Sequence, residues 1–495
     1  SASLQYRQQG SGTWIDGMAM TSDRRATIAS GGGSVANPYV NEWRASVLKV
    51  SANTTYEVQV TFADADGLGG TNPATGSTTT RTDLWPSTGN SYYVATDGDN
   101  GADGSIGTPW LTIAYGASQL ATGDTLYVNA GTYTEGLILV TVSGTSTDYT
   151  TIRNYGTDNV TIVPTGNVTL GSWEPAVQIK SNYTRFRGFT FASGNMAIYA
   201  GPTSFPGEVQ PHDVIIEYNV MTDNKTLVSS PSPYIGILVG GRSESFVTDM
   251  YNITVQNNDV YLVEPGPPGT NNVALTTGPA IQYFHAGPGA VVRNNRVFFS
   301  GTLQGGTHGQ DGINGMTNID YEYTWRDADI YGNYITGATD DGISLDGSGM
   351  NVRVWGNTIT RTNMAISTAP LIVGPTYVFR NLVYDGERHW IAGVGFSKNG
   401  EDSNGNVYLY HNTVVLDNRL VGTTFTDGSG KDATASYVYT QLGGDGGASN
   451  ISGANNLLIV DGPFVVVTES YPTQDYDLIY NYFTQTTYSY WAKFA

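Results

Sequence analysis

Hydrophobic and polar residues recur in short units along the chain from residue 181 onward. One unit is an asparagine, any residue and then an apolar residue, placed after a short predicted strand. It occurs at Asn219, Asn258, Asn295, Asn333, Asn357, Asn381, Asn412 and Asn456. The smallest interval between these asparagines is 24 residues, from Asn333 to Asn357. This interval predicts one bare coil of a repeat, and the longer intervals predict inserted loops.

A second unit, a small residue followed by an aliphatic one, runs in phase with the asparagines. It occurs at residues 197–198, 236–237, 280–281, 312–313, 342–343 and 365–366, and the pattern predicts another at Gly393-Val394. Two phased ladders predict a parallel β-helix, because equivalent residues of successive coils stack about 4.8 Å apart. We therefore expect apolar rungs in the interior and asparagines that hydrogen-bond along the stack.

Residues 109–121 have a helix-like pattern, which predicts a short helix able to cap the open end of the stack. The composition favours the same fold class. Glycine (62) and tyrosine (33) are abundant and only 13% of the residues are charged, whereas the good helix formers Lys, Glu and Leu are scarce. The sequence predicts an all-β protein, a right-handed parallel β-helix over residues 90–495 with a small β-sandwich before it.

The net charge of −20 argues against nucleic acid as a partner, because its backbone requires clustered Lys and Arg. A polyanionic substrate would need local cations or a bound metal. The chain has no cysteine, which excludes disulfides and thiolate metal sites. No apolar run approaches the roughly 20 residues of a membrane span, and no signal peptide is visible at SASLQYRQQG. We expect a mature or trimmed soluble protein that does not insert into membranes.

Residues 1–85 resemble a fibronectin type III module. The resemblance lies in SLQYRQQGSGTWIDG, in RASVLKVSANTTYEVQVTFADADGLGG and in STTTRTD, which fall where that family places its later strands. It implies a spacer or attachment module whose first two strands lie before Ser1. An unrelated small β domain is the alternative.

Aspartates are crowded where two rungs of the β-helix align. GQDGIN (309–314) aligns with TDDGIS (339–344), so Asp311 should lie one coil from Asp341, with Asp340 alongside and Asp346 further along the same coil. Carboxylates stacked at about 5 Å repel, so they must be protonated, solvated or bound to a cation. An oxygen-rich site without thiols suits calcium. Ordinary Asp-Gly turns or a structural calcium are the alternative to catalysis.

The repeats as a whole resemble the pectin-lyase-like β-helix superfamily, which includes lyases, hydrolases, phage tailspikes and adhesins. The sequences DGI, DDGISLDG and GVGFSKNG look like the DG, DDGxD and GFK motifs of its family-nine pectate lyases. The resemblance implies that Asp311, Asp340 and Asp341 bind calcium, and that Lys398 is the Brønsted base of a β-elimination. Calcium beside Lys398 would then lower its pKa.

The chain departs from the family motifs at two places. Ser344 stands where the family has an acid, and Asp346 is the candidate replacement. In the last motif a strict alignment puts Ser397 in the place of the lysine. Alternation along an ideal strand would also point Lys398 to the same side as Phe396 unless the strand has a bulge or ends there.

The leading functional hypothesis is a secreted or surface-exposed polysaccharide lyase that acts on a uronate-containing polysaccharide with calcium as cofactor. The surface that carries it could be that of a cell or of a virion. In this hypothesis Lys398, Asp341 and Asp311 are catalytic. The candidate substrate-binding residues are Arg361, Arg388, Arg326, His308 and Trp325.

Two other functions stay open at this point. Asp311 and the Asp340-Asp341 pair also resemble the first motifs of inverting polygalacturonase-type hydrolases, although the next coil, TNMAIST, lacks the third motif. A non-catalytic glycan-binding tailspike or adhesin is the other alternative.

Overall fold

The computed structural model describes residues 1–30, 33–165, 175–192, 196–202, 208–222, 235–240, 250–263, 278–284, 286–300, 311–315, 325–338, 340–347, 349–384, 395–399, 405–416, 424–426, 432–434, 438–441, 451–460, 464–467, 474–475, 478–481 and 486–488. The chain divides into two compact units, Ser1–Pro86 and Ser87–Ala495. Within the described residues, no helix is long and apolar enough to cross a bilayer.

The first unit is built on an antiparallel sheet in the order β2 (Ile15–Asp16), β1 (Ala2–Gln8), β7 (Thr55–Phe62) and β8 (Ala74–Thr79). Two antiparallel pairs accompany it, β3 (Thr21–Ser22) with β6 (Trp43–Arg44), and β4 (Thr27–Ser30) with β5 (Gly33–Ala36). Tyr6 and Tyr56 are buried between its strands. The likeness to a fibronectin module stays a prediction.

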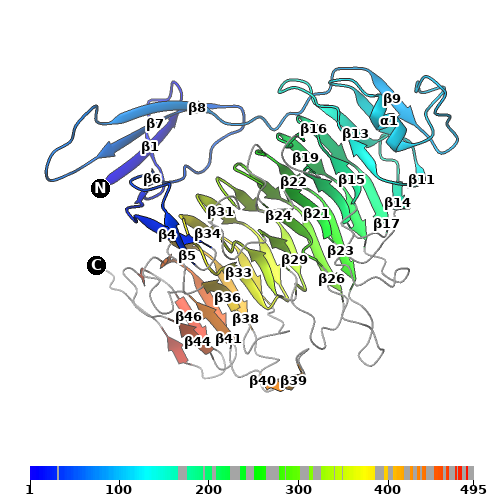
Figure 1. Ribbon diagram of the computed structural model, residues 1–495. Coiled ribbons are helices and arrows are strands. Elements are labelled where there is room, and N and C mark those ends of the chain that lie inside the picture. Colours follow the sequence, from blue (N-terminus) through cyan, green and yellow to red (C-terminus); the bar gives the residue numbers. More distant parts are fainter. Residues whose placement is uncertain are drawn as a thin grey trace. The chain divides into compact units, whose positions relative to one another are not determined.

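The second unit is a parallel β-helix of three long sheets (Figure 1). The described strands of the first sheet, all parallel, are β9 (Ser91–Val94), β10 (Thr125–Val128), β13 (Thr150–Asn154), β16 (Thr184–Arg187), β19 (Val214–Glu217), β22 (Thr254–Gln256), β25 (Val291–Arg293), β28 (Asp329–Tyr331), β31 (Val352–Trp355), β34 (Thr376–Phe379), β37 (Val407–Tyr410), β42 (Ile451–Ala454) and β45 (Gln474–Asp475).

The other two sheets follow in the same rotation. The described strands of the second are β11 (Gly131–Glu135), β14 (Val160–Pro164), β17 (Phe189–Ala192), β20 (Val220–Thr222), β23 (Asp259–Val263), β26 (Arg296–Ser300), β29 (Tyr334–Thr336), β32 (Thr358–Thr360), β35 (Leu382–Tyr384), β38 (Thr413–Leu416), β43 (Leu457–Val460), β46 (Leu478–Asn481) and the antiparallel β47 (Thr486–Tyr488).

The described strands of the third sheet are β12 (Ile138–Val140), β15 (Pro175–Ile179), β18 (Met196–Ala200), β21 (Ile235–Gly240), β24 (Ile281–Phe284), β27 (Ile313–Asn314), β30 (Asp341–Ser344), β33 (Met364–Thr368) and β36 (Gly395–Asn399). Outside the three sheets, β39 (Thr424–Thr426) pairs with β40 (Asp432–Thr434), and β41 (Val438–Gln441) with β44 (Phe464–Val467).

The predicted asparagine ladder is confirmed at the turn between the first and second sheets. In Asn258, for example, the backbone N–H and the side-chain Nδ2 both donate to Oδ1 of Asn295 at 3.0 Å, and Nδ2 also donates to the carbonyl of Ile216 at 3.0 Å. The ladder runs without a break through Asn219, Asn258, Asn295, Asn333, Asn357, Asn381, Asn412 and Asn456. Each coil is thus fixed to the next by buried hydrogen bonds.

The aliphatic rungs are confirmed in the third sheet. Six isoleucines stack in successive strands, and each is at most 1% exposed: Ile198, Ile237, Ile281, Ile313, Ile343 and Ile366. The residues of the rung predicted at Gly393-Val394 lie outside the described residues. In β36, Ser397 is the residue opposite Ile366.

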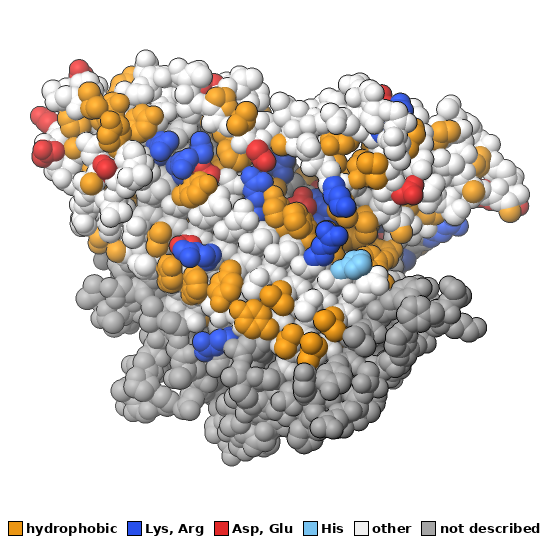
Figure 2. All heavy atoms as spheres, turned by 180° about the vertical axis from the view of Figure 1, so that it is seen from behind, with side chains coloured by type: hydrophobic (Ala, Val, Ile, Leu, Met, Phe, Trp, Pro, Cys, Tyr) orange, Lys and Arg blue, Asp and Glu red, His pale blue; other side chains and the backbone are white. Residues whose placement is uncertain are grey.

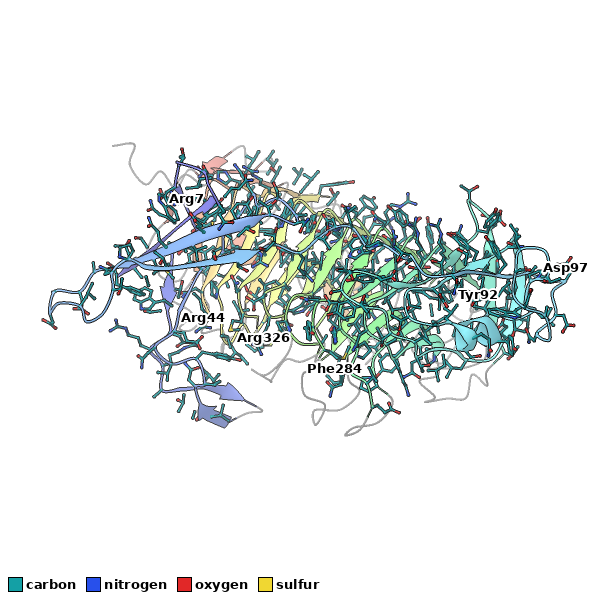
Figure 3. The ribbon with its side chains drawn as sticks, turned by 90° about the horizontal axis from the view of Figure 1, so that it is seen from above. Arg7, Arg44, Tyr92, Asp97, Phe284 and Arg326 are labelled. Atoms are coloured by element: carbon teal, nitrogen blue, oxygen red, sulfur yellow. The ribbon has the colours of Figure 1, made fainter. Side chains whose placement is uncertain are left out.

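The predicted cap helix is also present, as α1 (Ile113–Gln119) beside the first strands of the stack (Figure 1). Thr112 accepts a hydrogen bond from Tyr115 N–H at its N-terminus, and the Glu135 carboxylate accepts from the N–H groups of Ile113 and Ala114 at 2.7 and 2.9 Å. These acceptors satisfy donors that a helix start leaves unpaired. Figure 3 shows Tyr92, which stacks on Trp110 with ring centroids 5.0 Å apart, at this end of the β-helix.

Candidate functional site

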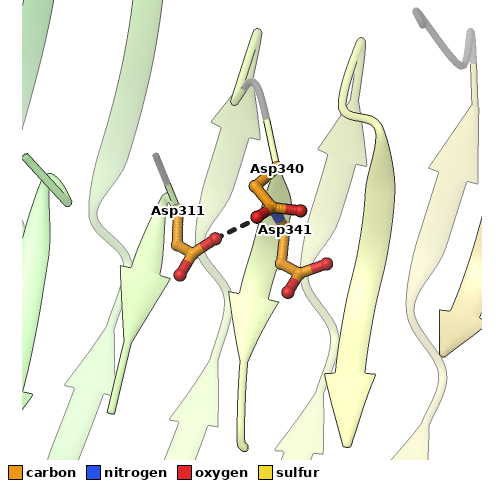
Figure 4. A group of neighbouring side chains, drawn as sticks. All are labelled: Asp311, Asp340 and Asp341. Atoms are coloured by element: carbon orange, nitrogen blue, oxygen red, sulfur yellow. Dashed lines mark hydrogen bonds between the residues drawn. The ribbon is translucent and has the colours of Figure 1, made fainter. Parts of the chain in front are cut away.

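Three aspartates meet on adjacent strands of the third sheet. Ile313 pairs with Ile343, so Asp311 and Asp341 occupy equivalent places on β27 and β30. The backbone N–H of Asp341 donates to Oδ1 of Asp311 at 3.0 Å (Figure 4). One carboxylate oxygen from each of Asp311, Asp340 and Asp341 lies within 4.8 Å of the other two. The alignment of GQDGIN with TDDGIS in the sequence therefore predicted the arrangement of these three residues that the structure has.

Two of the three carboxyls in the cluster are buried, and burial is the largest influence on their pKa values. Asp311 is 8% exposed and Asp341 2% exposed. Burial raises the pKa of Asp311 to about 7, and the charge of Asp340 acts in the same direction. Burial and the Asp311 carboxyl raise the pKa of Asp341 well above its usual range. Asp311 is therefore partly protonated near neutral pH, whereas at Asp341 the Lys398 ammonium opposes the rise and favours the charged carboxylate.

Lys398 reaches this cluster from β36, two coils further along the stack. Its Nζ lies 3.1 Å from Oδ2 of Asp341. Burial acts to lower the pKa of Lys398, but the carboxylates of Asp341 and Asp346 outweigh it and raise the pKa above its ordinary value. Without a bound cation, Lys398 is therefore a protonated partner of Asp341 and not a base.

The expected alternation of Phe396 and Lys398 is wrong. Phe396 is fully buried in the core, whereas the Lys398 side chain is 28% exposed and its backbone pairs with Ser367. The reason is that β30, like β15, β18 and β33, turns two consecutive residues inward. A Cβ on Gly342 would meet the Ile359 side chain at 2.6 Å, and the next residue, Ile343, is also in the core. This change of phase brings the later residues of these strands to the outer face.

A row of polar side chains surrounds the cluster on that outer face, and sequence reasoning missed most of it. Gln282, Asn314, Ser344, Ser367 and Lys398 are successive partners across β24, β27, β30, β33 and β36. Asn314 Nδ2 donates to Oδ2 of Asp311. A signal was present, because every member follows the inward rung by one residue.

Asp346, the fourth predicted metal ligand, has other partners. Its Oδ1 accepts hydrogen bonds from Ser367 Oγ at 2.5 Å and from Ala369 N–H at 2.6 Å. Burial raises its pKa. Asp346 lies outside the group of three whose oxygens converge, and it contributes charge that acts on Lys398.

Asn363 is a further polar group that the sequence did not single out. It occupies the place of Asp340 one coil further on, because Asp341 pairs with Met364. Asn363 is fully buried, yet neither its Oδ1 nor its Nδ2 has a hydrogen-bond partner among the described residues. Unpaired buried amides cost free energy, so this side chain is available to a bound group.

The predicted substrate-binding residues lie in different environments. Trp325 is 2% exposed, packs against Tyr283 with centroids 5.1 Å apart and donates from Nε1 to the carbonyl of Ser344 at 3.2 Å. A sugar cannot stack on a ring enclosed by the core, so its predicted role in binding sugar is wrong.

Two predicted arginines can be located. Arg361 is exposed at the turn between β32 and β33, with a φ of 55°. Arg326 (labelled in Figure 3) is half-buried before β28, and its Nε has no hydrogen-bond partner among the described residues. This geometry does not test the predicted role of either arginine in binding substrate. Arg388 and His308 lie outside the described residues.

Known proteins resemble this chain in fold at low identity. No protein-family model and no curated protein matches the sequence. Among solved structures, the complex of XylC with xylose has 13% identity and a TM-score of 0.47, and the match covers 78% of this chain and 86% of that one. The PL6 family polysaccharide lyase Pedsa3628 from Pseudopedobacter saltans has 14% identity and a TM-score of 0.45, with 75% and 83% covered. The pectate lyase Pel9A has 16% identity and a TM-score of 0.41, with 67% and 78% covered.

Proposed function

We propose that the protein is a polysaccharide lyase that cleaves a uronate-containing polysaccharide by cation-assisted β-elimination on the outer face of the third sheet. The observation that carries the proposal is the Lys398 ammonium 3.1 Å from Asp341, which itself belongs to a cluster of three converging carboxyls. A candidate base beside a candidate site for a divalent cation is the arrangement that this reaction requires.

The residues present fit calcium as the cofactor. The donors are hard oxygens from Asp311, Asp340 and Asp341. Oδ1 of Asn363, which has no hydrogen-bond partner among the described residues, could add an amide oxygen. Calcium prefers such carboxylate and amide oxygens. Burial first, and the neighbouring carboxyls second, raise the pKa values of Asp311 and Asp341. When bound, the cation would neutralise the carboxylates and lower the cost of an enolate-like intermediate.

In this proposal Lys398 moves the proton. Neutralised carboxylates no longer hold Lys398 protonated, so burial lowers the pKa of its amine and Nζ can accept a proton. It removes the proton from the carbon next to the uronate carboxylate. The electron pair forms a carbon–carbon double bond, the bond to the glycosidic oxygen breaks, and that oxygen leaves with the other electron pair. Asp346, held by Ser367 and Ala369, keeps Lys398 in place by its charge.

The spacing of the carboxyls disfavours the inverting hydrolase. An inverting enzyme keeps its two carboxyls about 6.5 to 9.5 Å apart so that a water fits between them. One oxygen from each of Asp311, Asp340 and Asp341 lies within 4.8 Å of the other two, which is closer than that separation. A purely glycan-binding protein would need no lysine beside this cluster. We also infer that the protein acts outside the cell, because a polymeric substrate does not cross membranes.

The test is to incubate the protein with a panel of uronate polysaccharides, in calcium and in chelator, and to follow ultraviolet absorbance of the unsaturated product. We expect a calcium-dependent rise that falls about a thousandfold in Lys398→Ala, because general-base catalysis contributes about 10² to 10⁴-fold. Lys180→Ala is the matched control, since Lys180 also pairs with an acid, Glu208 at 3.0 Å, away from the cluster. New reducing ends without absorbance would establish a hydrolase, and no product would favour a binding protein.

A further inference from the structure

The outer face of the first sheet carries cationic and aromatic side chains that the proposed chemistry does not use. One row crosses successive strands in register: Tyr93, Tyr127, Arg153, Arg187, Glu217, Gln256, Arg293, Tyr331, Trp355, Phe379 and Tyr410. Side chains alternate along a strand, and the neighbours of this row, such as Ile152, Phe186 and Ile216, are fully buried in the core. The row therefore lies on the outside of the β-helix.

Positive charge exceeds negative charge in this row, although the chain carries a net charge of −20. Arg185 and Arg187 contact a single buried carboxylate, Glu217, at 2.5 and 3.4 Å. Arg293 reaches the same network through Gln256, which accepts from Arg293 Nε at 2.6 Å and donates to Glu217 at 2.7 Å. Together with Arg153, these four arginines carry four formal positive charges beside the one negative charge of Glu217, a formal excess of three on these five side chains.

These guanidinium groups remain within reach of a ligand. The side chains of Arg185 and Arg187 are 19% and 21% exposed. Arg153 lies 5.8 Å from the centroid of the Tyr127 ring and donates to the Asn154 carbonyl at 3.2 Å. Figure 2 shows Lys and Arg side chains gathered among hydrophobic ones on one face of the molecule.

Aromatic side chains flank the arginines, but only some offer a surface to a ligand. Tyr218 is 50% exposed and its ring lies 4.7 Å beneath the Arg187 guanidinium; Tyr155 is 41% exposed. In contrast, Tyr331 and Trp355 stack on each other at 4.2 Å and 7°. Rings stacked in this way cover each other's faces, so they stabilise the contact between neighbouring strands and do not bind sugar. The exposed segment of this outer face therefore lies on β13, β16 and β25 and at Tyr218, which follows β19.

We propose that this segment, defined by Arg153, Arg185, Arg187, Arg293 and Tyr218, is a second, non-catalytic binding surface for a uronate polysaccharide. Guanidinium groups bind carboxylates bidentately, and a uronate chain presents carboxylates at regular intervals beside apolar ring faces. Arg153 and Arg187 are one strand spacing apart, about 4.8 Å, and Arg293 is three spacings beyond Arg187, roughly 14 Å. The choice of ligand rests on the proposed function, but the surface lies on a different sheet from the aspartate cluster.

The test is affinity electrophoresis of the whole protein through gels that contain polygalacturonate or alginate, with chelator present so that the proposed lyase chemistry is silent. We expect Arg153→Gln and Arg187→Gln each to weaken binding about tenfold, the loss expected for one charge-assisted hydrogen bond. Arg296→Gln is the matched control, because Arg296 is an exposed arginine paired with Asp259 on the second sheet. Arg153→Gln guards against misfolding, since it leaves Glu217 with both of its arginines.

Three results would overturn the proposal. Equal losses in Arg296→Gln would mean general attraction of a polyanion, and equal retardation by DNA would mean that the surface does not select a glycan. Unchanged binding in both row variants would overturn it too. Formation of the unsaturated product is measured separately, so a failure of this binding test would not contradict the lyase proposal. Conversely, a protein that forms no product but still binds the uronate polysaccharide through these arginines would support the second binding surface.

Discussion

At the aspartate cluster, Lys398 and a bound calcium ion would compete for the same negative charge. Lys398 and a calcium ion would both be attracted to Asp341, whose carboxylate lies 3.1 Å from the ammonium. Removal of the lysine charge should therefore affect turnover and cation binding in opposite directions. A residue that merely supports the fold would be expected to weaken both.

We predict that Lys398→Met abolishes product formation and tightens calcium binding on the order of tenfold, because it removes a positive charge within a few ångströms of the site. Isothermal titration calorimetry on the folded variant measures the affinity. Lys180→Met, which changes a lysine paired with Glu208, should leave the affinity unchanged. Weaker calcium binding in Lys398→Met would show that the cluster is not the cation site or that Lys398 holds it together.

At the scale of elements, the asparagine ladder ties the coils together at one turn. Asn357 accepts from Asn333 N–H and Nδ2 and donates from its own N–H and Nδ2 to Asn381, all at 2.9 to 3.0 Å. Asn357→Leu would leave buried donors of Asn333 without an acceptor, at about 1–3 kcal/mol each. We predict a loss of about 3 kcal/mol in the free energy of unfolding, measured by denaturant titration. Thr132→Ala, an exposed change on β11, should cost less than about 0.5 kcal/mol, and a similar small loss in Asn357→Leu would contradict a structural role for the ladder.

The elements also show where sequence reasoning succeeded and where it failed. Both ladders were readable because equivalent residues stack in register, so that Asn219 to Asn456 and Ile198 to Ile366 repeat with recognisable neighbours. The same register placed Asp311 beside Asp341. Lys398 was placed at the cluster by its motif, whereas simple alternation would have turned it toward the core, because alternation does not hold where Gly342 and Ile343 both face inward. Asn363 was missed because its lack of a hydrogen-bond partner within the described part of the chain is a property of the packed structure. Trp325 was misassigned because nothing in a loop sequence distinguishes an exposed ring from a buried one.

At the scale of the whole molecule, the two proposed surfaces would act on the same polymer. The aspartate cluster lies on the third sheet and the arginine row on the first. A chain held by the row raises the local concentration of its own bonds at the aspartate cluster, whereas an oligosaccharide too short to reach both surfaces gains nothing. The row should therefore matter for long substrates more than for short ones.

The quantity that reports this coupling is the ratio of kcat/KM on the polymer to kcat/KM on a short oligosaccharide of the same sugar. We predict that Arg153→Gln lowers this ratio about fivefold, a modest part of the gain that linked binding can give, and that Arg296→Gln on the second sheet leaves it unchanged. Because the ratio cancels any general loss of active enzyme, partial unfolding of a variant does not imitate the effect. An equal fall of both terms in Arg153→Gln would mean that the row supports the fold and does not hold substrate, since only a binding surface outside the reacting site discriminates by chain length.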